Sequence, residues 1–257
     1  MRFLLDSYAF QLFIMAGIKL KLELAIHPLC PYAQRAMYIN SFKKFPAEVI
    51  LVSTADPPAW FLDLNPLGEV PALKVTKGTE TFRLSESLNI SEYLDSLPGP
   101  HLYPYLECGQ IDYLSKSLID VFIKNKVGRF LSAFYGYIYS TTFTPEQQKE
   151  IEESFKEINN YVEYDHYVMS KILSNNSLTF ADVMLLPFVE RVFTLFDLAP
   201  QFVKDLDLEN LRNWYKKISG QDWAEQAKAT EHQLKNLYTE IRNGGYEGLK
   251  LPLSLYD

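Results

Sequence analysis

Apolar and polar residues alternate near the start of the chain. The apolar positions of this segment are Leu20, Leu22, Leu24 and Ile26. A period of two is typical of a strand with one buried face, because successive side chains of a strand point to opposite sides of the sheet. We therefore predict a half-buried strand over residues 19–26.

A turn follows this strand, and the pattern then becomes helical. The turn reads His27-Pro28-Leu29-Cys30-Pro31, and small or apolar residues recur after it at helical spacing. Pro31 suits the first position of a helix, because the N–H that proline lacks would have no partner there. The sequence thus predicts a helix that begins directly after Cys30.

The region up to residue 97 continues this mixture of strands and helices. Residues 49–52 form a β-branched run consistent with a second, buried strand, and residues 59–64 favour a short helix or turn. Residues 70–75 and 81–84 favour a third and a fourth strand, and residues 86–97 favour a helix. The apolar positions of this last helix are Leu88, Ile90, Tyr93, Leu94 and Leu97.

A linker, Pro98-Gly99-Pro100-His101, separates this region from one in which only helical periodicity is found. Thr144-Pro145-Glu146-Gln147 predicts a helix that starts with a capping box and with proline at its first position. Two apolar stripes are predicted to face a core, namely Ile111, Leu114, Leu118 and Val121, and Ile151, Phe155, Ile158 and Val162.

These patterns predict an α/β domain followed by an all-α domain. We assign residues 1–18 to an N-terminal extension, 19–98 to the α/β domain, 105–245 to the all-helical domain and 246–257 to a C-terminal tail. The apolar stretch from Tyr8 to Ala16 is too short to span a bilayer, which needs about 20 residues. We favour an extension that packs against the body of the protein over a cleaved targeting segment.

Composition excludes some classes of partner. The net charge is −7 and the 25 Lys and Arg residues are scattered, which argues against nucleic acid. The chain has two cysteines, Cys30 and Cys108, so a disulfide framework is not expected and a reducing compartment is the simplest interpretation. We expect a cytoplasmic protein, with mitochondria as the alternative. The four histidines show no metal-ligand spacing, so no metal is expected.

Cys30 is the strongest candidate for chemistry. A cysteine between a strand and a helix lies at the helix N-terminus, where unpaired N–H groups and the helix dipole favour negative charge. This position lowers the pKa of a thiol and raises its nucleophilicity. The alternative is a small buried residue that fills core space. Pro31, by fixing the start of the helix, favours the reactive thiol.

Two other features are ambiguous when each is taken alone. Pro71 starts a strand, so the Val70–Pro71 bond is a candidate for a cis peptide bond, and the Val70 backbone would be free to pair with an extended ligand peptide. Glu86 and Ser87 stand where a strand passes into a helix. They favour capping of that helix, although a carboxylate there would also accept a ligand ammonium and a hydroxyl would receive a carboxylate.

Taken together, the motifs resemble those of a known family. Three segments, in this order and spacing, are similar to the thioredoxin-like domain of glutathione transferases: Cys30-Pro31-Tyr32-Ala33-Gln34-Arg35, Asn65-Pro66-Leu67-Gly68-Glu69-Val70-Pro71-Ala72-Leu73 and Leu84-Ser85-Glu86-Ser87. The first resembles the omega class and its dehydroascorbate reductase and intracellular chloride channel relatives. Further on, Ser177-Leu178-Thr179-Phe180-Ala181-Asp182 resembles the capping box of the family's helical domain, and Leu186-Pro187-Phe188-Val189-Glu190-Arg191 resembles the omega pattern.

The resemblance implies a thioredoxin-like domain followed by the all-helical C-terminal domain of glutathione transferases, with glutathione as co-substrate. Cys30 would form a mixed disulfide with glutathione. The residues implied to bind the tripeptide are Pro31 and Tyr32 beside the sulfur, Val70 with cis-Pro71 at its cysteinyl part, and Glu86 and Ser87 at its γ-glutamyl end. Arg191 would line the cleft of the second substrate, with an ion pair inside the helical domain as an equal alternative.

One departure bears on ligand binding. The omega pattern has a lysine just before Pro-x-Trp-Phe, where it helps to bind the glycyl carboxylate. The corresponding segment here, Asp56-Pro57-Pro58-Ala59-Trp60-Phe61, offers no cation. The loss of such a charge-assisted contact costs roughly 1.5–3 kcal/mol.

Two functions fit these observations. The first is a glutathione-dependent thioltransferase or reductase with a monothiol mechanism, acting on a small electrophilic, disulfide or dehydroascorbate-like substrate. The second is a non-catalytic binding or structural subunit of a larger assembly on the same scaffold. The enzyme is favoured, because the position of Cys30 has little other explanation. A homodimer or an assembly subunit is implied by resemblance only.

Overall fold

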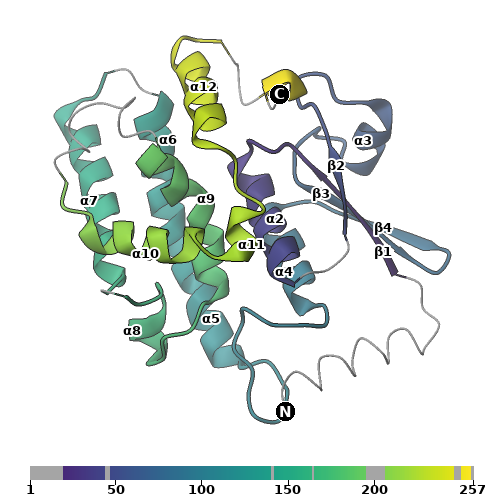
Figure 1. Cartoon of the computed structure of the whole chain (residues 1–257), viewed down its shortest axis with the longest axis horizontal. Coiled ribbons are helices and arrows are strands. Elements are labelled where there is room, and N and C mark those ends of the chain that lie inside the picture. Colours follow the sequence, from purple (N-terminus) through teal and green to yellow (C-terminus); the bar gives the residue numbers. More distant parts are fainter. Residues whose placement is uncertain are drawn as a thin grey trace. The chain divides into compact units, whose positions relative to one another are not determined.

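The computed structural model describes residues 20–43, 47–139, 142–163, 165–194, 206–245 and 250–255 (Figure 1). The prediction for residues 1–18 lies outside these ranges. The chain divides into two compact units, which are described separately. The first comprises residues 1–101, 226–228 and 248–257, and the second comprises residues 102–225 and 229–247. Residues 250–255, which the sequence assigned to a separate tail, thus group with the first unit.

The first unit is built around one mixed sheet of four strands in the order β2-β1-β3-β4. β2 runs parallel to β1, while β3 is antiparallel to both β1 and β4. In chain order its elements are β1 (Leu20–Ile26), α2 (Pro31–Lys43), β2 (Glu48–Leu51), α3 (Ala59–Leu64), β3 (Ala72–Lys77), β4 (Glu80–Leu84), α4 (Ser87–Ser96) and the short helix η2 (Leu253–Leu255).

The first part of β1 has two different faces, as the alternation predicts, whereas Ala25 near its end is buried on the same face as Glu23. Leu22 and Leu24 are buried on one face, which α2 and α4 cover while packing against each other (Figure 1). On the other face Glu23 forms ion pairs with Lys21 and Lys74, with N–O distances of 2.9 and 3.0 Å. The hydrogen bonds from both lysines lower the pKa of the Glu23 carboxyl.

The prediction of a buried second strand is wrong. β2 is an edge strand, and the side chains of Val49 and Leu51 are 39% and 42% exposed. Val52, just beyond the strand, is buried. A β-branched run predicts a strand from its backbone preference, but it does not tell whether a neighbouring element covers that strand.

The named elements in the described part of the second unit are all helices, and one isolated β-bridge joins Tyr105 and Ile111. The helices are α5 (Tyr113–Phe122), the π-helical turn η1 (Ile123–Val127), α6 (Gly128–Tyr139), α7 (Pro145–Tyr161), α8 (Ser170–Leu173), α9 (Phe180–Thr194), α10 (Glu209–Ser219), α11 (Asp222–Glu225) and α12 (Glu231–Arg242). The predicted capping box at Thr144 is present, with Gln147 as its partner. No described helix is both long enough and apolar enough to cross a membrane.

Of the two predicted apolar stripes, one is buried and the other is exposed. The stripe on α7 is buried throughout, whereas Leu114, Leu118 and Val121 of α5 are 72%, 39% and 56% exposed. α5 instead buries Ile119 and Phe122. This helix carries apolar residues at helical spacing on two faces, so its spacing alone does not tell which face meets the core.

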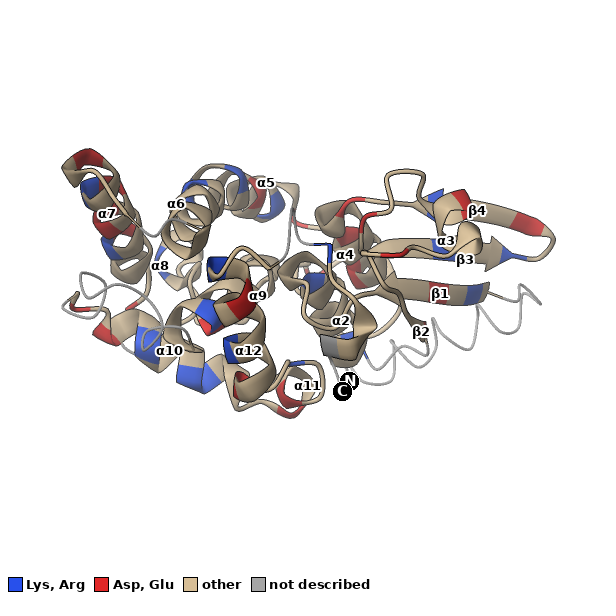
Figure 2. Cartoon of the chain, turned by 90° about the horizontal axis from the view of Figure 1, so that it is seen from above, with Lys and Arg blue, Asp and Glu red and all other residues tan. Residues whose placement is uncertain are grey.

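Charged side chains hold α6 and α7 together at the surface of this unit. Acidic residues predominate along α7, with Lys149 and Lys156 between them (Figure 2). Arg129 of α6 reaches three of the acidic ones, with its Nε 2.8 Å from Glu150, its Nη1 2.9 Å from Glu157 and its Nη2 3.6 Å from Glu153.

The centre of the second unit is α9, which is buried from Phe180 to Val192. Asp182 lies in its first turn and accepts hydrogen bonds from four donors: the Trp214 indole at 2.8 Å, the Val168 N–H at 2.8 Å, the Thr179 N–H at 2.9 Å and the Thr179 hydroxyl at 2.7 Å. Burial raises the pKa of Asp182, and these four hydrogen bonds oppose that shift. The predicted Thr179–Asp182 pair therefore also ties α9 to α10 and to residue 168.

We expect the substitution Asp182→Asn to destabilise the protein by about 3 kcal/mol, because an amide of the same shape leaves buried donors without an acceptor. Urea unfolding followed by circular dichroism measures this loss, with Asp222→Asn, an exposed residue of the same unit, as the control. Equal losses in the two variants would contradict the role given to the buried carboxylate.

Candidate functional site

Four segments of the chain meet at one end of the sheet, where three strands stop and one begins. β1 and β2 are parallel, so both end there. β3 is antiparallel to β1 and begins there, and β4 is antiparallel to β3 and ends there. The sheet therefore brings together the residues that follow β1, β2 and β4 and those that precede β3. These are the segments that carry the sequence motifs.

A pocket of about 700 Å³ lies at this end of the sheet, within the first unit. This volume is in the range of small-molecule sites. Its lining includes Cys30, Tyr32, Val70, Pro71, Glu86 and Ser87. Pro31 is buried and is not among the lining residues, so it starts α2 rather than facing the pocket. Among the described residues, no group of three or more His, Cys, Asp or Glu side chains is placed to hold a metal ion.

Cys30 lies immediately before the first residue of α2. Its carbonyl accepts the N–H of Gln34 at 3.0 Å, and its own N–H donates to the carbonyl of His27 at 3.0 Å. Its side chain is 8% exposed, and the Sγ atom lies 3.8 Å from the carbonyl oxygen of Val70. The sulfur is thus held at a helix N-terminus, where negative charge is stabilised.

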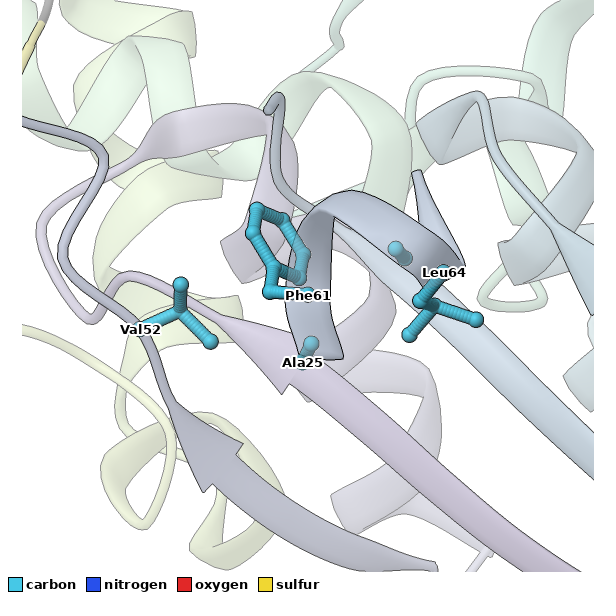
Figure 3. Close-up of a cluster of buried hydrophobic side chains, with 5 residues drawn as sticks. Ala25, Val52, Phe61 and Leu64 are labelled. Carbon is cyan, nitrogen blue, oxygen red and sulfur yellow. The ribbon is translucent and has the colours of Figure 1, made fainter. Parts of the chain in front are cut away.

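The Val70–Pro71 peptide bond is cis. Val70 packs against a small core made of Ala25, Val52, Phe61, Leu64 and Ala72 (Figure 3). From the preceding loop, Asn65 donates its side-chain amide to the carbonyl of Glu69 at 2.7 Å and accepts the N–H of Leu67 at 3.3 Å. The backbone that lines the pocket at Glu69 and Val70 is therefore fixed by a core and by an asparagine. Asn65 was not singled out as a site residue, although Asn before Pro-x-Gly is a turn signal.

Glu86 has an unusual backbone conformation for its residue type, with φ of 69°. It is the N-cap of α4, yet within the described structure its side chain makes no capping hydrogen bond and is exposed. The capping role that the sequence favoured is therefore not observed for the Glu86 side chain in the described structure. A non-glycine residue at such a φ costs about 1–3 kcal/mol and is found most often at functional sites.

Arg35 is a pocket residue that sequence reasoning missed. Its side chain is buried, its Nη1 donates to the hydroxyl of Ser87 at 3.3 Å, and its guanidinium lies 5.4 Å from the centre of the Tyr32 ring. Arg35 thus connects the start of α2 with the start of α4 and adds positive charge beneath the pocket. The available signal was a charged residue three positions after Tyr32, on the same face of a helix.

Arg191 occupies a different place from the one implied for a cleft residue. It is fully buried in the second unit, where its Nη1 donates to the carbonyl of Pro187 at 2.7 Å and lies 3.5 Å from the carboxylate of Glu190. This is the ion-pair alternative. Arg191 is not among the residues that line the pocket around Cys30.

Residues near the C-terminus form one wall of the pocket. The Leu251 N–H donates to the hydroxyl of Thr54 at 2.8 Å, and the Thr54 N–H donates to the carbonyl of Leu251 at 3.0 Å. His27 accepts the N–H of Leu29 on Nδ1, so its Nε2 carries the proton and donates to the carbonyl of Pro252 at 3.3 Å. We call residues 250–252 the strap. Lys250 and Leu251 both line the pocket.

Burial lowers the pKa of His27 below its ordinary value of 6.5. The folded protein therefore binds fewer protons at this residue than the unfolded chain does when the pH falls below 6.5. Its contribution to stability is complete above that pH and decreases as the pH falls toward the lowered pKa.

We expect the thermal midpoint of His27→Gln to fall less between pH 7.5 and pH 5.5 than that of the unsubstituted protein, because glutamine does not titrate. Differential scanning fluorimetry across this range measures the two slopes. His232→Gln, at an exposed position, should keep the original slope. If His27→Gln keeps it as well, His27 is not the group responsible.

Comparisons with known proteins agree with this geometry. Residues 29–97 match the family "Glutathione S-transferase, N-terminal domain". The chain is 41% identical to a protein of Aplysia californica named "Probable glutathione transferase" over 75 residues, 29% of this chain and 77% of that one. It is 28% identical over 201 residues to "Probable glutathione transferase omega-2" of Caenorhabditis elegans, with 74% and 73% of the two chains covered.

Comparison with solved structures also finds glutathione transferases. The crystal structure of glutathione transferase Omega 1C from Trametes versicolor superposes with a TM-score of 0.73, at 14% sequence identity, over 90% of this chain and all of that one. The arrangement is thus a thioredoxin-like unit followed by a helical one. The chain belongs to the glutathione transferase superfamily. Within it, the chain is similar to the omega class.

Proposed function

We propose that this protein is a glutathione-dependent thioltransferase or reductase in which Cys30 is the nucleophile. The observation that carries the proposal is the position of the Cys30 sulfur, at the N-terminus of α2 and 3.8 Å from the backbone of Val70. A thiol in this position has its thiolate stabilised by the helix, and a peptide bound along Val70 would present its own sulfur beside it.

The rest of the pocket suits the γ-glutamyl end of the tripeptide. Its ammonium would pair with the exposed Glu86 carboxylate. Its carboxylate would bind at the N-terminus of α4, where Ser87 offers a hydroxyl and Arg35 adds positive charge. Two charges of opposite sign at neighbouring positions would fix the direction in which the peptide lies.

The reaction is a pair of thiol–disulfide exchanges. In the first, the Cys30 thiolate attacks the glutathione sulfur of a mixed disulfide, a bond forms between the two sulfurs, and the other thiol leaves as its thiolate. In the second, a glutathione thiolate attacks the glutathione sulfur bound to Cys30. Glutathione disulfide leaves and the Cys30 thiolate is restored. For a dehydroascorbate-like substrate, two glutathione thiols supply the two electrons and leave as the disulfide.

The lining of the pocket supports a monothiol mechanism. The described lining residues include one cysteine, Cys30. The other cysteine of the chain, Cys108, is an exposed residue of the second unit. Because the described lining contains one cysteine, we assign the resolution of the mixed disulfide to a second glutathione.

We expect Cys30→Ser to lose more than a hundredfold in the reduction of a small glutathione mixed disulfide, because a hydroxyl does not replace the thiolate. Cys108→Ser is the matched control and should keep full activity. Intact-mass analysis after exposure to glutathione disulfide should find one adduct on Cys30, which free glutathione removes. Alkylation of Cys30 should reach half its maximal rate at a lower pH than that of free cysteine.

If glutathione binds but neither an adduct nor turnover depends on Cys30, the enzymatic proposal fails. The non-catalytic binding protein would then be the better description. Turnover retained in Cys30→Ser would contradict the proposal directly.

The strained backbone of Glu86 allows stability and binding to be separated. We expect Glu86→Gly to keep or raise thermal stability, because glycine adopts a φ of 69° without strain. The same substitution should weaken glutathione binding by about ten- to a hundredfold, because the charge-assisted contact is lost.

Glu86→Gln, which keeps the strain and removes the charge, should weaken binding without raising stability. Isothermal titration calorimetry and thermal unfolding measure the two properties. Glu92→Gln, exposed on α4 and outside the pocket lining, is the control. Unchanged affinity in both Glu86 variants would exclude this carboxylate from the ligand site.

A further inference from the structure

The two basic residues of the pocket lining differ in their exposure to solvent. Among the described lining residues, Glu69 and Glu86 are acidic, and Arg35 and Lys250 are basic. Arg35 is buried and is engaged with Ser87 and Tyr32. Lys250 is exposed and belongs to the strap. The basic side chain that is open to solvent at this pocket thus comes from the far end of the chain.

Glutathione requires positive charge at two places, because it has one carboxylate at its γ-glutamyl end and another on its glycine. The N-terminus of α4 and Arg35 would supply positive charge for the γ-glutamyl carboxylate. The segment in which the omega pattern has a lysine for the glycyl carboxylate reads Asp56-Pro57-Pro58 here. None of these three residues is a cation, so this segment offers no charged partner for a carboxylate.

The strap lies on the same wall as this segment. Leu251 is buried and exchanges backbone and side-chain hydrogen bonds with Thr54, two residues before Asp56. Pro57 in turn lies beside Gly68, a lining residue, since a Cβ atom built on Gly68 would be 3.7 Å from the Pro57 ring. The hydrogen bonds of Leu251 therefore hold the backbone of the neighbouring Lys250 close to the segment at 56–58, which has no cation.

We propose that Lys250 binds the glycyl carboxylate of glutathione and so replaces the lysine that the segment at 56–58 lacks. This inference rests on the proposed function, because it takes glutathione as the ligand. A lysine is suited to the task, since its ammonium is a point charge on a flexible four-carbon stem that reaches from an anchored backbone. Thr54 and His27 act as positioning residues, because they hold the strap at Leu251 and Pro252.

The test compares two ligands and three variants of the full chain. The ligands are glutathione and its derivative with the glycyl carboxylate converted to an amide, which differ in that one charge. The variants are Lys250→Ala, Lys77→Ala as an exposed control outside the pocket, and the double substitution Lys250→Ala with Pro57→Lys. Calorimetry gives both affinities, and thermal unfolding checks that each variant is folded.

We expect the unsubstituted protein and Lys77→Ala to bind glutathione about five- to tenfold more tightly than the amide, at low ionic strength. Lys250→Ala should lose this preference through weaker binding of glutathione, with the affinity for the amide unchanged. The double variant should regain it. Salt should reduce the preference wherever it exists, because an exposed ion pair is screened.

A preference that survives in Lys250→Ala would overturn the inference while leaving the proposed function intact. So would equal affinities for the two ligands in the unsubstituted protein. Failure of every variant to bind either ligand would refute the proposed function and, with it, this inference. The two failures are thus distinguishable in one set of titrations.

Discussion

The site depends on the register between β1 and β3. Ala25 and Ala72 are paired across these strands, and both are fully buried. Their small side chains allow Phe61 of α3 to pack on the sheet at this point (Figure 3). With this register the residues after β1 and those before β3 lie side by side, which sets Cys30 opposite Val70. A shift by one residue would turn every side chain to the other face and separate the thiol from the peptide backbone.

The pocket offers local positive charge although the whole protein is negatively charged. The chain carries a net charge of −7, yet the ligand proposed for it is itself an anion. Local features therefore have to attract it: the N-termini of two helices, the Arg35 guanidinium and the strap. Arg35 is costly to bury, and its contacts with the Tyr32 ring and the Ser87 hydroxyl offset that cost.

Much of this arrangement was predictable from local patterns. The alternation in β1 and the start of α2 at Pro31 follow from residue type and spacing. The cis bond before Pro71 was a candidate from residue type and was implied by the resemblance to the family. What local patterns miss is whether a face is covered. The β2 side chains and the stripe on α5 are apolar and still exposed, because burial depends on which element packs on them. The strap was missed for the same reason. Nothing in its own sequence indicates that Leu251 pairs with Thr54, and the role of Arg35 depends on Ser87, 52 positions away.

The strap also imposes an order of events on synthesis. His27 and Pro252 are 225 positions apart, and Thr54 and Leu251 are 197 apart, with the whole helical unit between them. A ribosome adding 5–20 residues per second makes those 197 residues in on the order of 10–40 s. Once β4 has been made within that interval, all four strands and Cys30 have been synthesised, while the last wall of the pocket does not yet exist. The thiol is therefore present on the nascent chain before the strap can form its wall of the pocket.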